Sequence, residues 1–200
     1  MNYQYISKVV IIGDSGCGKS SLMHRLTDAR FQSTHEVTLG SDFGASVVRV
    51  GDTAIKLQLW DTAGQETYRA VTRSYFRGSS GALLVYDVSR RPTFEHLQQW
   101  LGDLRAMAGD AVCVILVGNK SDLEERGVKT EEAQRWAEEN KLTEFIETSA
   151  KTGANVQTAF EHTAAEILRR IQKGSFDVND ISHGVRLTER AKPSAGCCSS

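Results

Sequence analysis

The chain has 200 residues, of which 40% are hydrophobic and 24% charged, a composition that fits one folded domain and excludes a disordered chain. Its 24 basic and 25 acidic residues leave a net charge of −1, so no overall basic field exists to hold nucleic acid. Four cysteines are too few for a disulfide framework and indicate a reducing compartment. We expect neither a signal peptide nor a membrane-spanning helix, because no apolar run approaches about 18 residues.

Strand-like and helix-like segments then alternate along the chain. A β-branched run over 8–12 predicts a buried strand, and the apolar spacing over 20–27 predicts a helix. Two extended segments, 43–50 and 54–60, flank Gly51-Asp52-Thr53 and predict a hairpin. Further strands are predicted over 81–87, 111–118 and 144–147, and further helices over 92–107, 130–140 and 155–172. This alternation is typical of an α/β fold, a mostly parallel sheet covered on both faces, with the hairpin as an antiparallel edge.

The helical periodicity ends near Gly174. Residues 174–200 hold few large apolar residues, and their charges cancel. The sequence therefore predicts a folded domain over 1–173 and a flexible tail over 174–200.

A phosphate-binding loop is predicted between the first strand and the first helix. Residues 13–20 read GDSGCGKS and fit the pattern G-x-x-x-x-G-K-[ST] in full. The glycines let backbone N–H groups converge on phosphate oxygens, and the following helix presents its positive end. This pattern indicates a nucleoside triphosphate without fixing the base. The expected nucleotide-binding residues are Ser15, Gly16, Cys17, Gly18, Lys19, Ser20 and Ser21, with Ser20 also a Mg²⁺ ligand.

Two later loops carry the residues expected to read the base. Residues 119–122 (NKSD) and 148–151 (TSAK) both follow predicted parallel strands, whose carboxyl ends form the ligand edge of such sheets. A carboxylate at Asp122 can accept two hydrogen bonds from guanine, a pair that adenine does not offer. The other expected contacts in these loops are Asn119, Lys120, Ser149, Ala150 and Lys151.

These motifs together resemble the Ras-type small GTPases, and the resemblance covers about Ser7–Gln172. It rests on GDSGCGKS, Thr38, DTAGQE, NKSD and TSAK. The resemblance implies a P-loop GTPase domain with a six-stranded mixed sheet, one antiparallel edge strand and five flanking helices. It also implies GTP or GDP as the bound nucleotide and Mg²⁺ as the cofactor.

The resemblance further assigns the residues that sense the γ-phosphate. Asp61 and Thr38 match Mg²⁺ ligands, and the Gly64 N–H matches a γ-phosphate donor. Gln65 matches the catalytic, water-positioning glutamine. Phe31 matches an aromatic beside the guanine, although Phe31 taken alone would favour a core position.

The implied reaction is in-line attack of water on the γ-phosphate of GTP. Because the sequence shows no arginine of its own near the phosphates, hydrolysis is expected to be slow and to need an activating protein. Loss of the γ-phosphate would release the loops around Thr38 and Gln65. Two alternatives stay open: an adaptor that holds nucleotide without turnover, and a P-loop kinase or ATPase.

Several stretches resemble the Rab family in particular: KLQLW at 56–60, YFRG at 75–78 and GALLVYD at 81–87. Phe43, Trp60 and Tyr75 match the aromatic triad that Rab proteins present to effectors, although ordinary packing would also suit them. Leu39, Ser41 and Asp42 depart from the family pattern, which puts effector choice in question. The Rab-two branch, acting between endoplasmic reticulum and Golgi, is the nearest, with endosomal branches as the alternative.

The last four residues are Cys197-Cys198-Ser199-Ser200. In a Rab, such an ending resembles a substrate for double geranylgeranylation at Cys197 and Cys198, and a neutral tail favours two lipids because one chain binds a bilayer only marginally. Exposed thiols are the plain alternative. The implied location is the cytoplasmic face of Golgi or related membranes, with a cytosolic pool. The implied partners are an exchange factor, an activating protein, effectors, a GDP-dissociation inhibitor and a prenylation escort protein.

Overall fold

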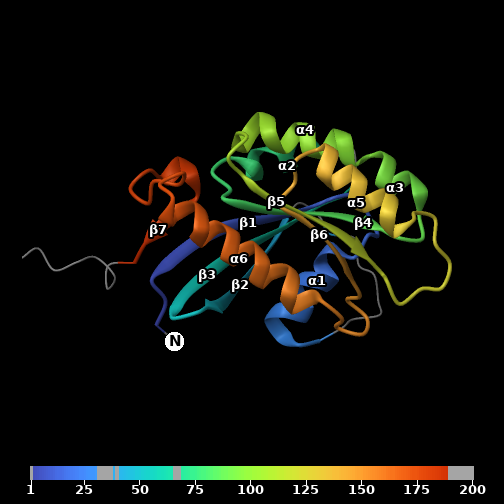
Figure 1. The fold of residues 1–200 in the computed structure, drawn as a ribbon, viewed down its shortest axis with the longest axis horizontal. Helices are drawn as coiled ribbons and strands as arrows, with labels where there is room; N and C mark the ends of the chain where they lie inside the picture. The colour runs from blue at the N-terminus through green and yellow to red at the C-terminus, as the bar shows by residue number, and fades with distance from the viewer. Residues whose placement is uncertain (1, 31–37, 39–40, 65–68, 189–200) are drawn as a thin grey trace, which may run out of the picture.

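In the residues that the computed structural model describes (2–30, 38, 41–64 and 69–188, with only the backbone of 69–72 and 181), seven strands form one mixed sheet (Figure 1). Six of them follow the order β2-β3-β1-β4-β5-β6. All neighbours on this path are parallel except β2 and β3. The strands are β1 (Tyr5–Ile12), β2 (Ser41–Val50), β3 (Thr53–Thr62), β4 (Gly81–Asp87), β5 (Cys113–Asn119), β6 (Glu144–Thr148) and β7 (Val185–Leu187).

The predicted α/β fold is confirmed, and β7 is an addition that the sequence does not predict. β4 pairs only with residues 9–12 of β1, which leaves the first half of β1 with a free edge on that side. β7 fills this edge in antiparallel orientation, with Arg186 opposite Ile6. The sheet therefore has seven strands in place of the six that were predicted.

Helices cover both faces of the sheet, with α1 and α6 on one side and α2 to α5 on the other (Figure 1). The helix predicted over 92–107 is interrupted at His96 and forms α3 and α4, so the described residues hold six α-helices rather than five. No helix in this part of the chain has the length and apolarity to cross a bilayer. The helices are α1 (Lys19–Asp28), α2 (Arg69–Phe76), α3 (Arg91–Glu95), α4 (Leu97–Ala108), α5 (Thr130–Glu139) and α6 (Val156–Gln172).

The hydrophobic core lies in two layers, one on each side of the sheet. Val9 and Ile11 of β1 pack in the layer beneath α1 and α6, whereas Val10 and Ile12 pack in the layer beneath α4 and α5. β4 and β5 are buried at every position, which explains their continuous apolar sequences. This double burial fixes the strand ends, and the loops that follow them form the site described below.

Residues 174–188 fold onto the domain, which corrects the prediction of a flexible tail from residue 174. Phe176 and Val185 are almost fully buried, and a short 3₁₀ turn, η2 (Ile181–His183), leads into β7. Gly184, at φ 69°, passes so close to Gly78 that a Cβ would lie 2.2 Å from its carbonyl oxygen. The sequence could not show this docking because the few apolar residues have no period and their contacts are long-range. Residues 189–200, with Cys197 and Cys198, lie outside the described residues.

Replacing Phe176 with alanine tests whether this segment contributes to folding. Because the ring is buried against the domain, we expect the free energy of unfolding to fall by about 3 kcal/mol. Urea denaturation followed by circular dichroism measures the change. Phe43→Ala is the matched control, since half of that side chain is exposed. Equal stability of Phe176→Ala and the unaltered chain would mean that residues 174–188 do not stabilise the fold.

Candidate nucleotide-binding site

The predicted site residues that the structure describes gather at the carboxyl edge of the sheet. The loops that carry them follow β1, β3, β5 and β6, and they converge around the N-terminus of α1 (Figure 1). This is the edge at which open α/β sheets hold ligands. Segments distant in sequence thus meet because the parallel strands end side by side.

The phosphate loop takes the curled backbone that its glycines permit. Gly13, Gly16 and Gly18 have φ values of 140°, 77° and 88°, which side chains rarely tolerate. A Cβ at Gly13 would lie 2.0 Å from the carbonyl oxygen of Val85. No side chain caps the N-terminus of α1, so its first N–H groups are available to an anion.

Lys19 lies beneath this loop and is nearly buried, with 6% of its surface exposed. Its Nζ donates to the carbonyl oxygen of Asp14 at 2.8 Å. Burial lowers the pKa of Lys19, and the nearby Asp61 carboxylate opposes that shift. A buried ammonium group with one carbonyl partner is well matched to phosphate oxygens.

Three oxygen-bearing side chains, those of Ser20, Thr38 and Asp61, meet near the start of α1. The Ser20 hydroxyl donates to Oδ2 of Asp61 and lies 3.0 Å from the Thr38 hydroxyl. Asp61 is fully buried, and its Oδ1 has no hydrogen-bond partner among the residues that the structure describes. Burial raises the pKa of Asp61, and the bond from Ser20 opposes the shift. An unpartnered carboxylate oxygen beside two hydroxyls is a donor set that fits Mg²⁺, which prefers hard oxygen ligands.

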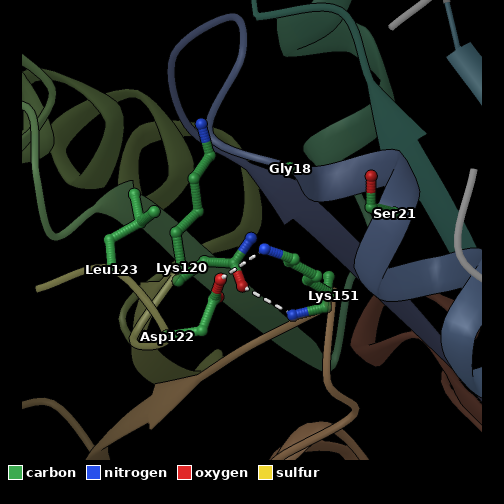
Figure 2. A pocket seen from close by; sticks show the side chains of 8 residues that line it. Gly18, Ser21, Lys120, Asp122, Leu123 and Lys151 are labelled. Carbon is green, nitrogen blue, oxygen red and sulfur yellow. Dashed lines mark hydrogen bonds and ion pairs between the residues drawn. The ribbon is translucent and has the colours of Figure 1, made fainter. Parts of the chain in front are cut away.

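A pocket beside the phosphate loop holds the residues predicted to read the base. Its lining includes Ser21, Lys120, Asp122, Ala150 and Lys151 (Figure 2). The Ser149 hydroxyl donates to Oδ1 of Asp122 at 2.6 Å, and Lys151 Nζ lies 3.8 Å from Oδ2. These contacts orient the carboxylate into the pocket that Figure 2 shows.

Asn119 joins the phosphate loop to the second base loop. Its Nδ2 donates to the carbonyl oxygen of Cys17 at 2.8 Å, while its Oδ1 accepts from the Thr148 hydroxyl and the Ala150 N–H, both at 3.1 Å. The side chain is 1% exposed. Because every polar atom of this amide is used by the protein, Asn119 fixes the spacing of the two loops rather than contacting solvent.

The sequence analysis did not identify Asp87 and Arg90, which support the first base loop (119–122) and the phosphate loop. Oδ2 of Asp87 accepts from Lys120 Nζ at 2.7 Å and from Arg90 Nε at 3.1 Å. Burial would raise the pKa of Asp87, but its bonds with Lys120 and Ser89 outweigh it and lower the pKa. The sequence feature that could have identified Asp87 is its position at the end of the central strand β4.

Arg90 also corrects the expectation of no arginine near the phosphates. Its Nη2 donates to the carbonyl oxygen of Ser15 at 2.9 Å and lies 3.3 Å from where a Cβ of Gly16 would be. The guanidinium therefore braces the phosphate loop, with its Nε bonded to Asp87 and its Nη2 bonded to Ser15.

His96 and Trp100 hold the side chain of Asp14 in the phosphate loop. His96 Nδ1 lies 2.7 Å from Oδ2 of Asp14, and the indole N–H of Trp100 donates to Oδ1 at 2.8 Å. One carboxylate oxygen of Asp14 is thus held by Trp100 of α4, and the other is held by His96, the residue that precedes α4. Apart from the residue types, no sequence pattern indicates this contact.

Gly64 and the predicted aromatic triad are also placed by the structure. The carbonyl oxygen of Gly64 accepts from the Ser15 N–H at 3.0 Å, against the phosphate loop. Phe43 meets Trp60 edge to face at 5.3 Å, and Trp60 stacks on Tyr75 at 5.5 Å between ring centres. The predicted residues Phe31 and Gln65, and Leu39 among the departures, lie outside the described residues.

Comparison with known families agrees with this geometry. A family model described as the Ras family matches residues 8–169, which is most of the chain. The match spans the phosphate loop, the three oxygen-bearing side chains of Ser20, Thr38 and Asp61, and both base loops.

Proposed function

The chain belongs to the Ras family and is a small GTPase, and from this premise we propose that it is a Rab-type switch of membrane traffic in the early secretory pathway. The observation that carries the proposal is one continuous site. Asp122 lies in the base pocket, Lys19 lies beneath the phosphate loop, and Ser20, Thr38 and Asp61 meet beyond it. These groups match guanine, phosphates and Mg²⁺ in that order.

Mg²⁺ would be held by Ser20 and Thr38, with Asp61 as the acidic partner, and when bound it would neutralise charge on the β- and γ-phosphates. Lys19 supplies a second positive charge at the phosphates, already desolvated before the nucleotide binds. The Gly64 N–H is expected to donate to the γ-phosphate, and Gln65 to orient the attacking water. The Nε and Nη2 groups of Arg90 are bonded to Asp87 and Ser15, and we propose slow intrinsic hydrolysis that an activating protein accelerates.

Phosphate release in a single turnover tests the switch against the non-hydrolysing adaptor. With Mg²⁺-GTP the unaltered chain is expected to release phosphate slowly, and Gln65→Leu is expected to slow this by about a hundredfold because water loses its positioning group. Nucleotide affinity should be the same in both. Absence of phosphate release from the unaltered chain, even with a Rab-activating protein added, would favour the adaptor.

The Rab assignment is supported by the stretches at 56–60, 75–78 and 81–87 and by the contact of Phe43, Trp60 and Tyr75. We place the protein on Golgi or related membranes, with an endosomal Rab as the alternative. Its partners would be an exchange factor, an activating protein, effectors, a GDP-dissociation inhibitor and a prenylation escort protein.

Membrane attachment is proposed through geranylgeranyl groups on Cys197 and Cys198. The double variant Cys197→Ser with Cys198→Ser is expected to bind nucleotide normally and to move almost wholly to the cytosol, because no lipid remains to hold it. Fractionation of cells expressing the tagged full chain measures this, with Cys113→Ser as the control. Continued membrane association of the double variant would refute the lipid anchor.

A further inference from the structure

One side of the strands β1, β2, β3 and β7 faces away from α1 and α6. Ile55, Leu57 and Leu59 of β3 belong to the core beneath those helices, so the alternating Lys56, Gln58 and Trp60 point to the opposite side. Residues directly opposite on β2, β1 and β7 share that direction. We name this side the outer face.

The end of the outer face nearest the nucleotide site is aromatic. Phe43, opposite Trp60, keeps 50% of its surface exposed, and Tyr75 of α2 stacks on the same indole. Among the described elements, α2 contacts this part of β3. An exposed aromatic side chain packed on two further rings is typical of an interface anchor.

The other end of the outer face is basic. It carries Arg49 of β2, Lys56 of β3 and Arg186 of β7, and Lys8 of β1 lies between this end and Trp60. The strand positions of this face carry no aspartate or glutamate. A concentration of four cations is notable in a chain of net charge −1.

These cations have no acidic partner among the described residues. Lys8 Nζ donates to the carbonyl oxygen of Arg77 at 2.8 Å and lies 5.4 Å from the Trp60 ring centre. Lys56 Nζ lies 5.4 Å from the ring centre of Tyr3. Burial lowers the pKa of Lys8, as expected for a cation with no nearby carboxylate. Arg49, Lys56 and Arg186 can therefore pair with an anionic partner. Lys8 adds a positive charge whose hydrogen bond is to a carbonyl oxygen.

The docking of β7 completes this basic end. A hollow lies there between β1, β3 and the last strand, and its lining includes Lys8, Gln58, Gly78 and Arg186. Residues 174–188 thus add a fourth cation to this face and form one wall of the hollow.

We propose that the outer face binds a protein partner carrying an apolar patch beside an acidic patch. The apolar patch meets Phe43, Trp60 and Tyr75, and the carboxylates meet the four cations. Phe43 and Arg49 are six residues apart on β2, so the two patches are separated by about 20 Å. The proposal rests on the proposed switch function and names the chemistry of its effector. A protein is a better match than a membrane, because a protein surface can hold carboxylates and apolar side chains at the fixed spacing of the basic hollow and the three aromatic rings.

Selection from a display library of helical hairpins with randomised surfaces tests the proposal. The target is the full chain loaded with a non-hydrolysable GTP analogue. We expect the enriched binders to carry clustered Asp and Glu next to aromatic or aliphatic residues. Arg49→Glu with Arg186→Glu should weaken them by about tenfold or more, because like charges then face each other. Lys141→Glu, at an exposed position after α5, is the matched control and should leave affinity within about twofold.

A charge-swapped binder, with its acidic cluster replaced by lysine, should regain affinity for the double variant. Enriched binders without acidic clusters, or equal affinity for both chains, would overturn the proposal. So would loss of binding to phosphatidylserine vesicles in the double variant with unchanged binder affinity, since the face would then serve a membrane. Nucleotide affinity and phosphate release, measured on the same variants, report separately whether the switch function itself fails.

Discussion

Asp122→Asn is expected to change the preferred base of the site from guanine to xanthine. The guanine N1–H and N2–H₂ groups need two acceptors, and the Asp122 carboxylate faces the base pocket with Ser149 and Lys151 holding it (Figure 2). An asparagine offers one acceptor and one donor. It therefore opposes a guanine N–H with its own N–H₂ group, whereas xanthine presents a carbonyl oxygen at that place.

The expected loss of GDP affinity is about a thousandfold, because a site built for a hydrogen-bond pattern rejects the wrong partner strongly. Xanthosine diphosphate should gain affinity by a similar factor. Competition against a fluorescent nucleotide measures both. Asp52→Asn, in the exposed hairpin turn, is the control and should change neither affinity. Unchanged GDP affinity in Asp122→Asn would mean that the pocket does not hold guanine.

Gly64→Ala is expected to weaken binding of GTP far more than binding of GDP. A Cβ at Gly64 would lie 2.4 Å from the Ser15 nitrogen, 2.5 Å from the Asp14 carbonyl carbon and 2.5 Å from Lys19 Nζ. Two of these atoms are phosphate-loop backbone, so the segment after β3 must move away. That movement removes the Gly64 N–H from the γ-phosphate, which GDP lacks.

In Gly64→Ala we expect the ratio of GTP affinity to GDP affinity to fall by about tenfold to a hundredfold. Gly102→Ala is the matched control, because its added Cβ would meet no atom within 4 Å. Dissociation rates of labelled GTP and GDP give the ratio. An equal loss for both nucleotides would place Gly64 away from the γ-phosphate.

The phosphate loop and the base loops could be predicted because each is a contiguous motif after a strand. The apolar runs of β4 and β5 likewise predicted buried strands, and both are buried throughout. Contiguous patterns of this kind carry their own structural context.

The remaining features depend on contacts between distant segments. Trp100 reaches Asp14 across 86 residues, and Arg90 reaches Ser15 across 75. β7 has three residues and no apolar period, and it forms because β1 offers a free edge. No local pattern encodes such pairings, so sequence reasoning missed the anchors of the phosphate loop and the basic end of the outer face.

Equilibrium competition of GTP, GDP and ATP against fluorescent GDP, bound to the purified chain with Mg²⁺, tests most directly whether this site selects guanine. We expect GTP and GDP to displace the probe at concentrations about a thousandfold or more below that of ATP, since only guanine satisfies Asp122. Displacement by ATP as effective as by GTP would contradict this selectivity.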